Sequence, residues 1–156
     1  MGAKLGFVVN NLGPSQLAYN LLTKANALLS QRYDLDLIVF YEQPARPCVI
    51  PNFSIMPLSE TWGYDGPLVA TDLSSAATLI NLPNPGRKIF YVYDLEWTFE
   101  PKRPYRALQA IYGHPELTIL CRGEDHKGAI EDSWNVWATA LGEIDPTTIL
   151  EFLGGK

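Results

Sequence analysis

Cysteine is scarce in this sequence: only Cys48 and Cys121 occur among 156 residues, and the two lie far apart. Disulfide frameworks and zinc clusters need several cysteine or histidine residues at short spacings, so neither is expected. Both cysteines are instead expected to be small buried hydrophobic residues. The sequence accordingly predicts no metal site, and it suggests no cofactor.

Positive charge is also sparse. The chain has 12 Lys and Arg residues against 17 Asp and Glu residues, which gives a net charge of -5 and a pI near 4.9. Nucleic-acid binding requires clustered basic side chains, so no nucleic-acid partner is expected. Only Lys102, Arg103 and Arg106 lie close together in the sequence. We interpret them as a solvated surface.

Long apolar runs are missing as well. A membrane helix needs about 20 consecutive apolar residues, and the longest runs here are far shorter. No basic segment, long apolar stretch or cleavage site follows Met1, so no export signal is visible. We therefore expect a cytoplasmic protein without a membrane span.

The sequence does contain a regular alternation of apolar strand patterns and helical patterns. Strands are expected at 4–9, 35–41, 66–70, 88–93 and 117–121, with one more short candidate at 53–56. Helices are expected at 16–31, 71–82, 125–134 and 146–153. Another helix is expected to begin with Pro104 as its first residue and to run to about 112. The segment 135–145 is ambiguous. This order predicts one three-layer, Rossmann-like α/β domain over residues 1–156, with a mainly parallel sheet of five to six strands.

Ligands of open parallel sheets bind beyond the carboxyl ends of the strands, so the loops after the strands are candidate sites. The first such loop holds Asn10, Asn11, Gly13 and Ser15. It has one glycine and lacks the G-x-G-x-x-G pattern, so a dinucleotide site is not expected. The free N–H groups that begin the following helix could bind an anion or a sugar oxygen. The alternative is an ordinary turn in which Ser15 caps the helix.

Two carboxylates, Asp94 and Glu96, follow the strand at 88–93. Such carboxylates could accept hydrogen bonds from a polyol or act as a general base, which makes them the candidate catalytic residues, and Trp97 could stack on a sugar ring. The alternative is structural: Asp94 caps a turn and Glu96 pairs with Arg103 or Arg106.

Three further residues are candidates for ligand binding. Thr71 begins the loop after the strand at 66–70, and Arg122 and His126 belong to a dense mixed-charge loop after the strand at 117–121. A lone histidine without a Ser or Cys nucleophile in a recognisable motif is more often structural or solvated.

The segment from Lys88 to Tyr112, KIFYVYDLEWTFEPKRPYRALQAIY, resembles a motif of rhamnosyltransferase-like enzymes among the GT-B glycosyltransferases. The opening segment FVVNNLGPSQLAYNLLTKANAL resembles the first strand, loop and helix of those enzymes, and the likeness covers most of residues 4–130. One departure is Tyr93, where the family commonly has Gln. The matching positions within the motif are Tyr91, Val92, Asp94, Glu96, Phe99 and Pro101.

This resemblance is confined to the N-terminal half of such an enzyme. It implies that Asn11, Gly13, Asp94 and Glu96 border an interdomain cleft, and that the missing half would provide most contacts to a nucleotide-sugar donor. A second Rossmann-like chain or a homo-oligomer would then complete a split glycosyltransferase. The alternative is a non-catalytic module that binds a small polar ligand or a protein. A flavodoxin-like nucleotide-binding domain is disfavoured because no phosphate loop is present.

Overall fold

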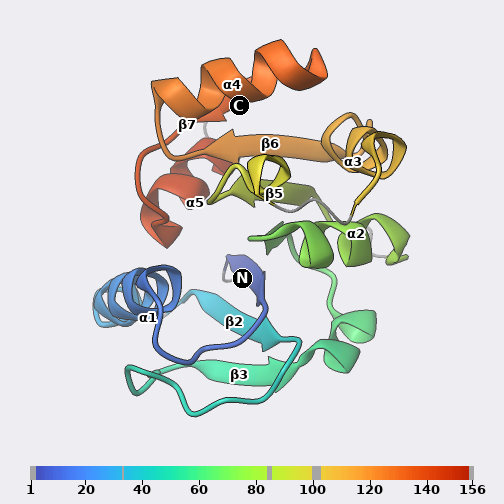
Figure 1. Cartoon of the computed structure of the whole chain (residues 1–156). Coiled ribbons are helices and arrows are strands. Elements are labelled where there is room, and N and C mark those ends of the chain that lie inside the picture. The colour runs from blue at the N-terminus through green and yellow to red at the C-terminus, as the bar shows by residue number, and fades with distance from the viewer. Residues whose placement is uncertain (1–2, 33, 84–85, 100–102, 155–156) are drawn as a thin grey trace.

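Seven parallel strands form one sheet in the computed structural model, which describes residues 3–32, 34–83, 86–99 and 103–154 (Figure 1). The strand order is β3-β2-β1-β4-β5-β6-β7, and every neighbouring pair is parallel. The strands are β1 (Lys4–Val9), β2 (Asp36–Tyr41), β3 (Ser54–Pro57), β4 (Leu68–Ala70), β5 (Lys88–Val92), β6 (Leu117–Cys121) and β7 (Ala138–Ala140).

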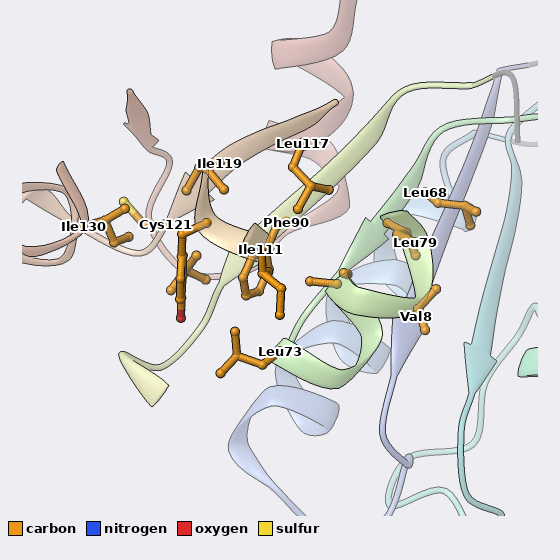
Figure 2. Close-up of a cluster of buried hydrophobic side chains, with 14 of the residues drawn as sticks. Val8, Leu68, Leu73, Leu79, Phe90, Ile111, Leu117, Ile119, Cys121 and Ile130 are labelled. Carbon is orange, nitrogen blue, oxygen red and sulfur yellow. The ribbon is translucent and has the colours of Figure 1, made fainter. Parts of the chain in front are cut away.

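Helices cover both faces of this sheet. Helices α1 (Gln16–Leu29) and α5 (Pro146–Gly154) pack on one face, where they share a core with β1 and β2. Helices α2 (Leu73–Asn81), α3 (Tyr105–Tyr112) and α4 (Glu124–Trp134) cover the other face. Figure 2 shows Leu73, Ile111 and Ile130 from these three helices around the side chains of the central strands. Two short 3-10 turns, η1 (Leu58–Gly63) and η2 (Glu96–Thr98), complete the elements.

The central strands read as continuous apolar runs because both of their faces are covered. All five residues of β5 are buried, including Lys88 at its start. The Lys88 ammonium donates to the Leu82 carbonyl at 2.7 Å and pairs with Glu116 at 3.3 Å. These two partners, one of them charged, offset the cost of burying an ammonium group at the start of an apolar strand.

The sheet has seven strands, not the expected five to six. The short candidate at 53–56 forms β3, and the additional strand β7 lies within the ambiguous segment 135–145. Strand β7 has only three residues, and it is reached through Asn135, which ends α4 in the left-handed conformation. Its sequence, Ala-Thr-Ala, has no large apolar residue that would mark a buried strand, unlike the equally short β4. Its Ala138 N–H donates to the Glu131 carboxylate of α4 at 3.0 Å.

Most helix positions were predicted from spacing, with small shifts at the ends. Helix α1 begins after Ser15, whose hydroxyl accepts the Ala18 N–H at 3.0 Å, and it ends two residues before the expected Gln31. Pro104 precedes α3 as its N-cap and is not the first helical residue, because its backbone is extended. Cys121 is buried as expected, but Cys48 is exposed because it lies in the irregular loop after β2.

The chain reverses its direction of travel across the sheet between β1 and β4. It runs outward from β1 to β2 and β3, then returns past β1 to β4 and continues to β7. The loops that follow β1 and β4 therefore lead to helices on opposite faces, which opens a crevice at the carboxyl ends of these two strands. Within the described ranges, no helix is long and apolar enough to span a membrane.

Candidate functional site

A cleft of about 430 Å³ lies at the carboxyl edge of the sheet, where the strand order reverses. The start of α1 forms one wall, through residues 15–17, and the start of α2 contributes Thr71 and Asp72. The loops after β5 and β6 complete the lining with Tyr93, Asp94, Glu96, Phe99 and Arg122. Four loops that are separated in the sequence thus meet at one cleft.

Glu96 is a half-buried carboxylate that lines the cleft. It begins the turn η2, and its Oε1 accepts the backbone N–H of Leu73, the first residue of α2, at 2.9 Å. Burial raises the pKa of Glu96 to about 7, the negative charge of Asp72 acts in the same direction, and the bond from Leu73 opposes both. Among the described residues, Oε2 of Glu96 makes no hydrogen bond. The second oxygen is available to a ligand, on a carboxyl group that gains and loses a proton near neutral pH.

Asp72 occupies the N-terminus of the same helix. Its carboxylate accepts the Ser75 N–H at 2.7 Å, and the buried Ser75 hydroxyl accepts the N–H groups of Thr71 and Asp72, both at 3.1 Å. Glu96 and Asp72 thus accept two of the first N–H groups of α2, those of Leu73 and Ser75. The Thr71 hydroxyl donates to the Val8 carbonyl at 2.9 Å and ties this turn to β1.

Arg122 is the only basic residue among the described lining of the cleft. Its guanidinium lies over the ring of Tyr93, 4.5 Å from the ring centre, and donates to the Tyr93 carbonyl at 3.2 Å. It also pairs with Glu143 at 3.2 Å and more loosely with Asp94 at 3.8 Å. Arg122 therefore joins the loops that follow β5, β6 and β7, and much of its charge is already balanced.

Five of the ten candidate residues line this cleft: Ser15, Thr71, Asp94, Glu96 and Arg122. Asn10, Asn11 and Gly13 instead shape the turn after β1, in which the Asn11 side chain accepts the Gly13 N–H at 2.9 Å and donates to Asn10 at 3.1 Å. The structural alternative for this loop thus has direct support in these contacts.

Trp97 and His126 lie outside the cleft lining. Trp97 packs edge-on against Tyr112 and Trp134, with ring centres 5.3 and 5.6 Å apart, so its ring belongs to the core beneath α3 and α4. His126 lines a shallower hollow with Glu124 and Asp125, and its buried Nδ1 has no hydrogen-bond partner there. Arg122 borders both the hollow and the cleft.

Five residues that were not among the candidates also line the cleft: Gln16, Leu17, Asp72, Tyr93 and Phe99. Asp72 had a signal, because an acidic residue at a helix start was already recognisable as a cap. Tyr93 had none, because it continues the apolar pattern of β5 and its position over Arg122 depends on the neighbouring strand. The structural alternative for Glu96 placed it with Arg103 or Arg106. The structure shows a hydrogen bond from the Leu73 N–H to Glu96, and the positive charge of Arg103 also acts on Glu96 and lowers its pKa.

The cleft is thus acidic, lies at the reversal of strand order and holds one carboxyl group with a raised pKa. No group of three or more potential metal ligands occurs among the described residues. Comparison with known proteins yields no matching family model, no significantly similar curated protein and no significantly similar solved structure.

Proposed function

We propose that this chain is a Rossmann-like domain of a GT-B-type glycosyltransferase, and that its cleft binds the sugar acceptor, with Glu96 as the general base. The observation that carries the proposal is the state of Glu96. It is a half-buried carboxyl group in the cleft, with a pKa raised to about 7 and an oxygen that no described residue engages. A base works best when its pKa lies near the working pH.

In the proposed step, Glu96 accepts the proton of an acceptor hydroxyl. That hydroxyl oxygen forms a bond to the anomeric carbon of the donor sugar, and the bond from this carbon to the nucleotide phosphate breaks. The proton moves to the carboxylate, and the electron pair of the broken bond leaves with the nucleotide. Asp94, exposed at the cleft mouth, would accept a hydrogen bond from a second hydroxyl of the acceptor.

The position of the cleft supports the proposal. The strand order across β3-β2-β1-β4-β5-β6 is that of doubly wound sheets, whose ligands bind where the order reverses. Fold alone does not establish an activity, so the proposal depends on the side chains of the cleft.

The donor half would be contributed by a second Rossmann-like chain or by a second copy of this one. A nucleotide sugar carries phosphate groups that need basic partners. Arg122 is the only basic side chain among the described lining residues, and Glu143 and Asp94 already engage it. The cleft of this chain is therefore better suited to bind the acceptor than to bind the phosphates of the donor.

A thermal-shift screen of the purified chain tests the proposal, because a ligand that binds only the folded state raises its apparent stability. The panel contains methyl glycosides as acceptor probes and nucleotide sugars as donor probes. We expect stabilisation by at least one methyl glycoside, weakened in Asp94→Ala. Transfer assays with the donor half present should then show activity that Glu96→Gln reduces at least 100-fold. No response to any glycoside would overturn the acceptor assignment.

The second candidate function is a binding module without catalysis. It is favoured by the engagement of Arg122 by carboxylates, since the described cleft has no other basic group for a phosphate. Under this alternative, a small polar ligand still stabilises the chain. Glu96→Gln would then change affinity, and no transfer would occur with any donor half.

A further inference from the structure

Phe99 is an apolar side chain that the fold leaves uncovered inside the cleft. It lines the cleft, it is 64% exposed, and it belongs to neither apolar core of the described chain. A single exposed apolar residue is ordinary on a protein surface, so exposure alone does not mark a site. Phe99 differs because it lies in a concave site among polar groups, where aromatic rings commonly contact ligands.

The turn η2 presents Phe99 and Glu96 to the cleft together. Glu96 begins this turn and Phe99 directly follows it, and the backbone N–H of Phe99 donates to the Glu96 carbonyl at 3.1 Å. The Thr98 hydroxyl donates to the Leu95 carbonyl at 2.6 Å and closes the same turn. The aromatic ring and the carboxyl group are thus carried at the two ends of one hydrogen-bonded turn.

The side chains between the cleft residues anchor this turn in the core. Leu95 and Trp97 pack against the core beneath α3 and α4, and Trp97 contacts two core aromatic rings edge-on. Asp94 and Glu96, by contrast, line the cleft. The segment therefore alternates between cleft and core, and the backbone that carries Phe99 is held before a ligand binds. Such pre-organisation lowers the cost of ordering a binding site.

We infer that Phe99 is the stacking surface of this cleft, on which the apolar C–H face of a pyranose ring lies while hydroxyl groups at the ring edge donate to Glu96 and Asp94. The inference rests on the proposed function: it names the acceptor as a cyclic sugar and Phe99 as a specificity-determining residue. A pyranose combines an apolar face with hydroxyl donors, and ionised carboxylates only accept hydrogen bonds. The stacking role expected of Trp97 thus passes to a residue two positions further along the chain.

Binding measurements with matched probes test the inference. Methyl glucoside has a rigid ring, sorbitol has similar hydroxyl groups on an open chain, and 1-methyluracil has a flat ring with a single N–H donor. The three are titrated by calorimetry at pH 8, where Glu96 is largely ionised. We expect methyl glucoside to bind about tenfold more tightly than either other probe, because only it brings both a rigid apolar face and several donors to the cleft.

Variants of Phe99 separate its aromatic face from its apolar area. The side chain is exposed and the turn uses only its backbone, so these variants are expected to fold. Phe99→Ala and Phe99→Leu should each weaken methyl glucoside about tenfold, whereas Phe99→Trp should retain the affinity, because stacking needs an aromatic ring. Trp62→Ala is the control, because Trp62 is 70% exposed on the other short turn, η1, and lies outside the cleft lining.

Proton NMR of methyl glucoside gives a readout that a change in stability would not produce. Protons directly above an aromatic ring are shielded, so the C–H protons of one sugar face should shift to lower frequency on binding to the unaltered chain. The same shifts should appear with Phe99→Trp and be absent with Phe99→Leu. If a variant fails to fold, these shifts in the unaltered chain still test the stacking.

The outcomes separate this inference from the proposed function. Binding of methyl glucoside that Phe99→Ala leaves unchanged would overturn the stacking inference and leave the acceptor proposal standing. Equal affinity for sorbitol, or tighter binding of 1-methyluracil, would also overturn the inference. Binding of no glycoside at all would overturn both proposals together.

Discussion

The Oε1 atom of Glu96 lies 2.9 Å from the backbone nitrogen of Leu73, so the loop after β5 closes the N-terminus of the helix that follows β4. This one bond joins two neighbouring strands at the edge where ligands of such sheets bind. It also exposes the carboxyl group to opposing influences, because burial favours its neutral form and the N–H group favours its charged form.

Glu96 should make the stability of the chain depend on pH in a defined direction. Its pKa in the folded state is raised from 4.5 to about 7, so between these values the folded chain binds a proton that the unfolded chain has released. The free energy of unfolding therefore falls as the pH rises through this window. Glu96→Gln lacks this contribution, so the variant should gain stability relative to the unaltered chain between about pH 5 and 8. Urea unfolding across that range measures the difference, and a constant difference would contradict the raised pKa.

Tyr91 and Tyr112 allow a comparison of how a hydrogen-bonded and an unbonded buried hydroxyl affect the stability of the chain. The Tyr91 hydroxyl donates to the Gly142 carbonyl, whereas the buried Tyr112 hydroxyl has no partner among the described residues. Tyr91→Phe should lower the free energy of unfolding by about 1–2 kcal/mol, because the Gly142 carbonyl loses its donor. Tyr112→Phe should leave stability unchanged or raise it. Chemical unfolding of both variants checks this contrast, and equal losses would refute it.

Lys88 should be needed for stability although it is a charged residue within the sheet. Its ammonium group satisfies the Leu82 carbonyl, so Lys88→Met would leave that carbonyl without its donor. We expect a loss of about 1–3 kcal/mol in the free energy of unfolding. Lys24→Met is the control, because the Lys24 side chain is 40% exposed and its ion pair with Asp145 is loose at 3.9 Å. Similar losses in the two variants would contradict a special role for Lys88.

The two cysteines should react very differently with a thiol reagent. Cys48 is exposed, whereas Cys121 is buried at the end of β6 and burial raises the pKa of its thiol. Reaction requires the accessible thiolate, so one equivalent should react quickly in the folded chain and two in denaturant. Cys48→Ser should abolish the fast phase. A fast phase that survives this change would mean that the end of β6 opens readily.

The alternation of strands and helices was predictable because each buried strand of four or more residues is an apolar run and each long helix has one apolar side. Strand β7 was not, because its sequence Ala-Thr-Ala contains two alanines and no large apolar residue, whereas the equally short β4 is the apolar run Leu-Val-Ala. At the site, chain order placed Asp94 and Arg122 at the same sheet edge. The contact between Glu96 and Leu73 spans 23 positions in the sequence and depends on the pairing of β4 with β5. Trp97 was expected to contact a ligand but packs on Tyr112 in the core, because the sequence alone does not distinguish an aromatic ring that faces a ligand from one that faces the core.

The bond between Glu131 and Ala138 bears on how the chain behaves in a crowded solution. Strand β7 is an outer strand of the sheet, and the Leu141 N–H that follows it donates to the Cys121 carbonyl of β6. Successive residues of a strand point their N–H groups to opposite sides, so the Ala138 N–H points away from β6, to the side where no strand pairs with β7. The Glu131 carboxylate takes that N–H and places a negative charge beside it. An incoming strand from another molecule would have to displace the carboxylate before it could pair. The last strand of the sheet thus carries its own protection against the growth of intermolecular aggregates.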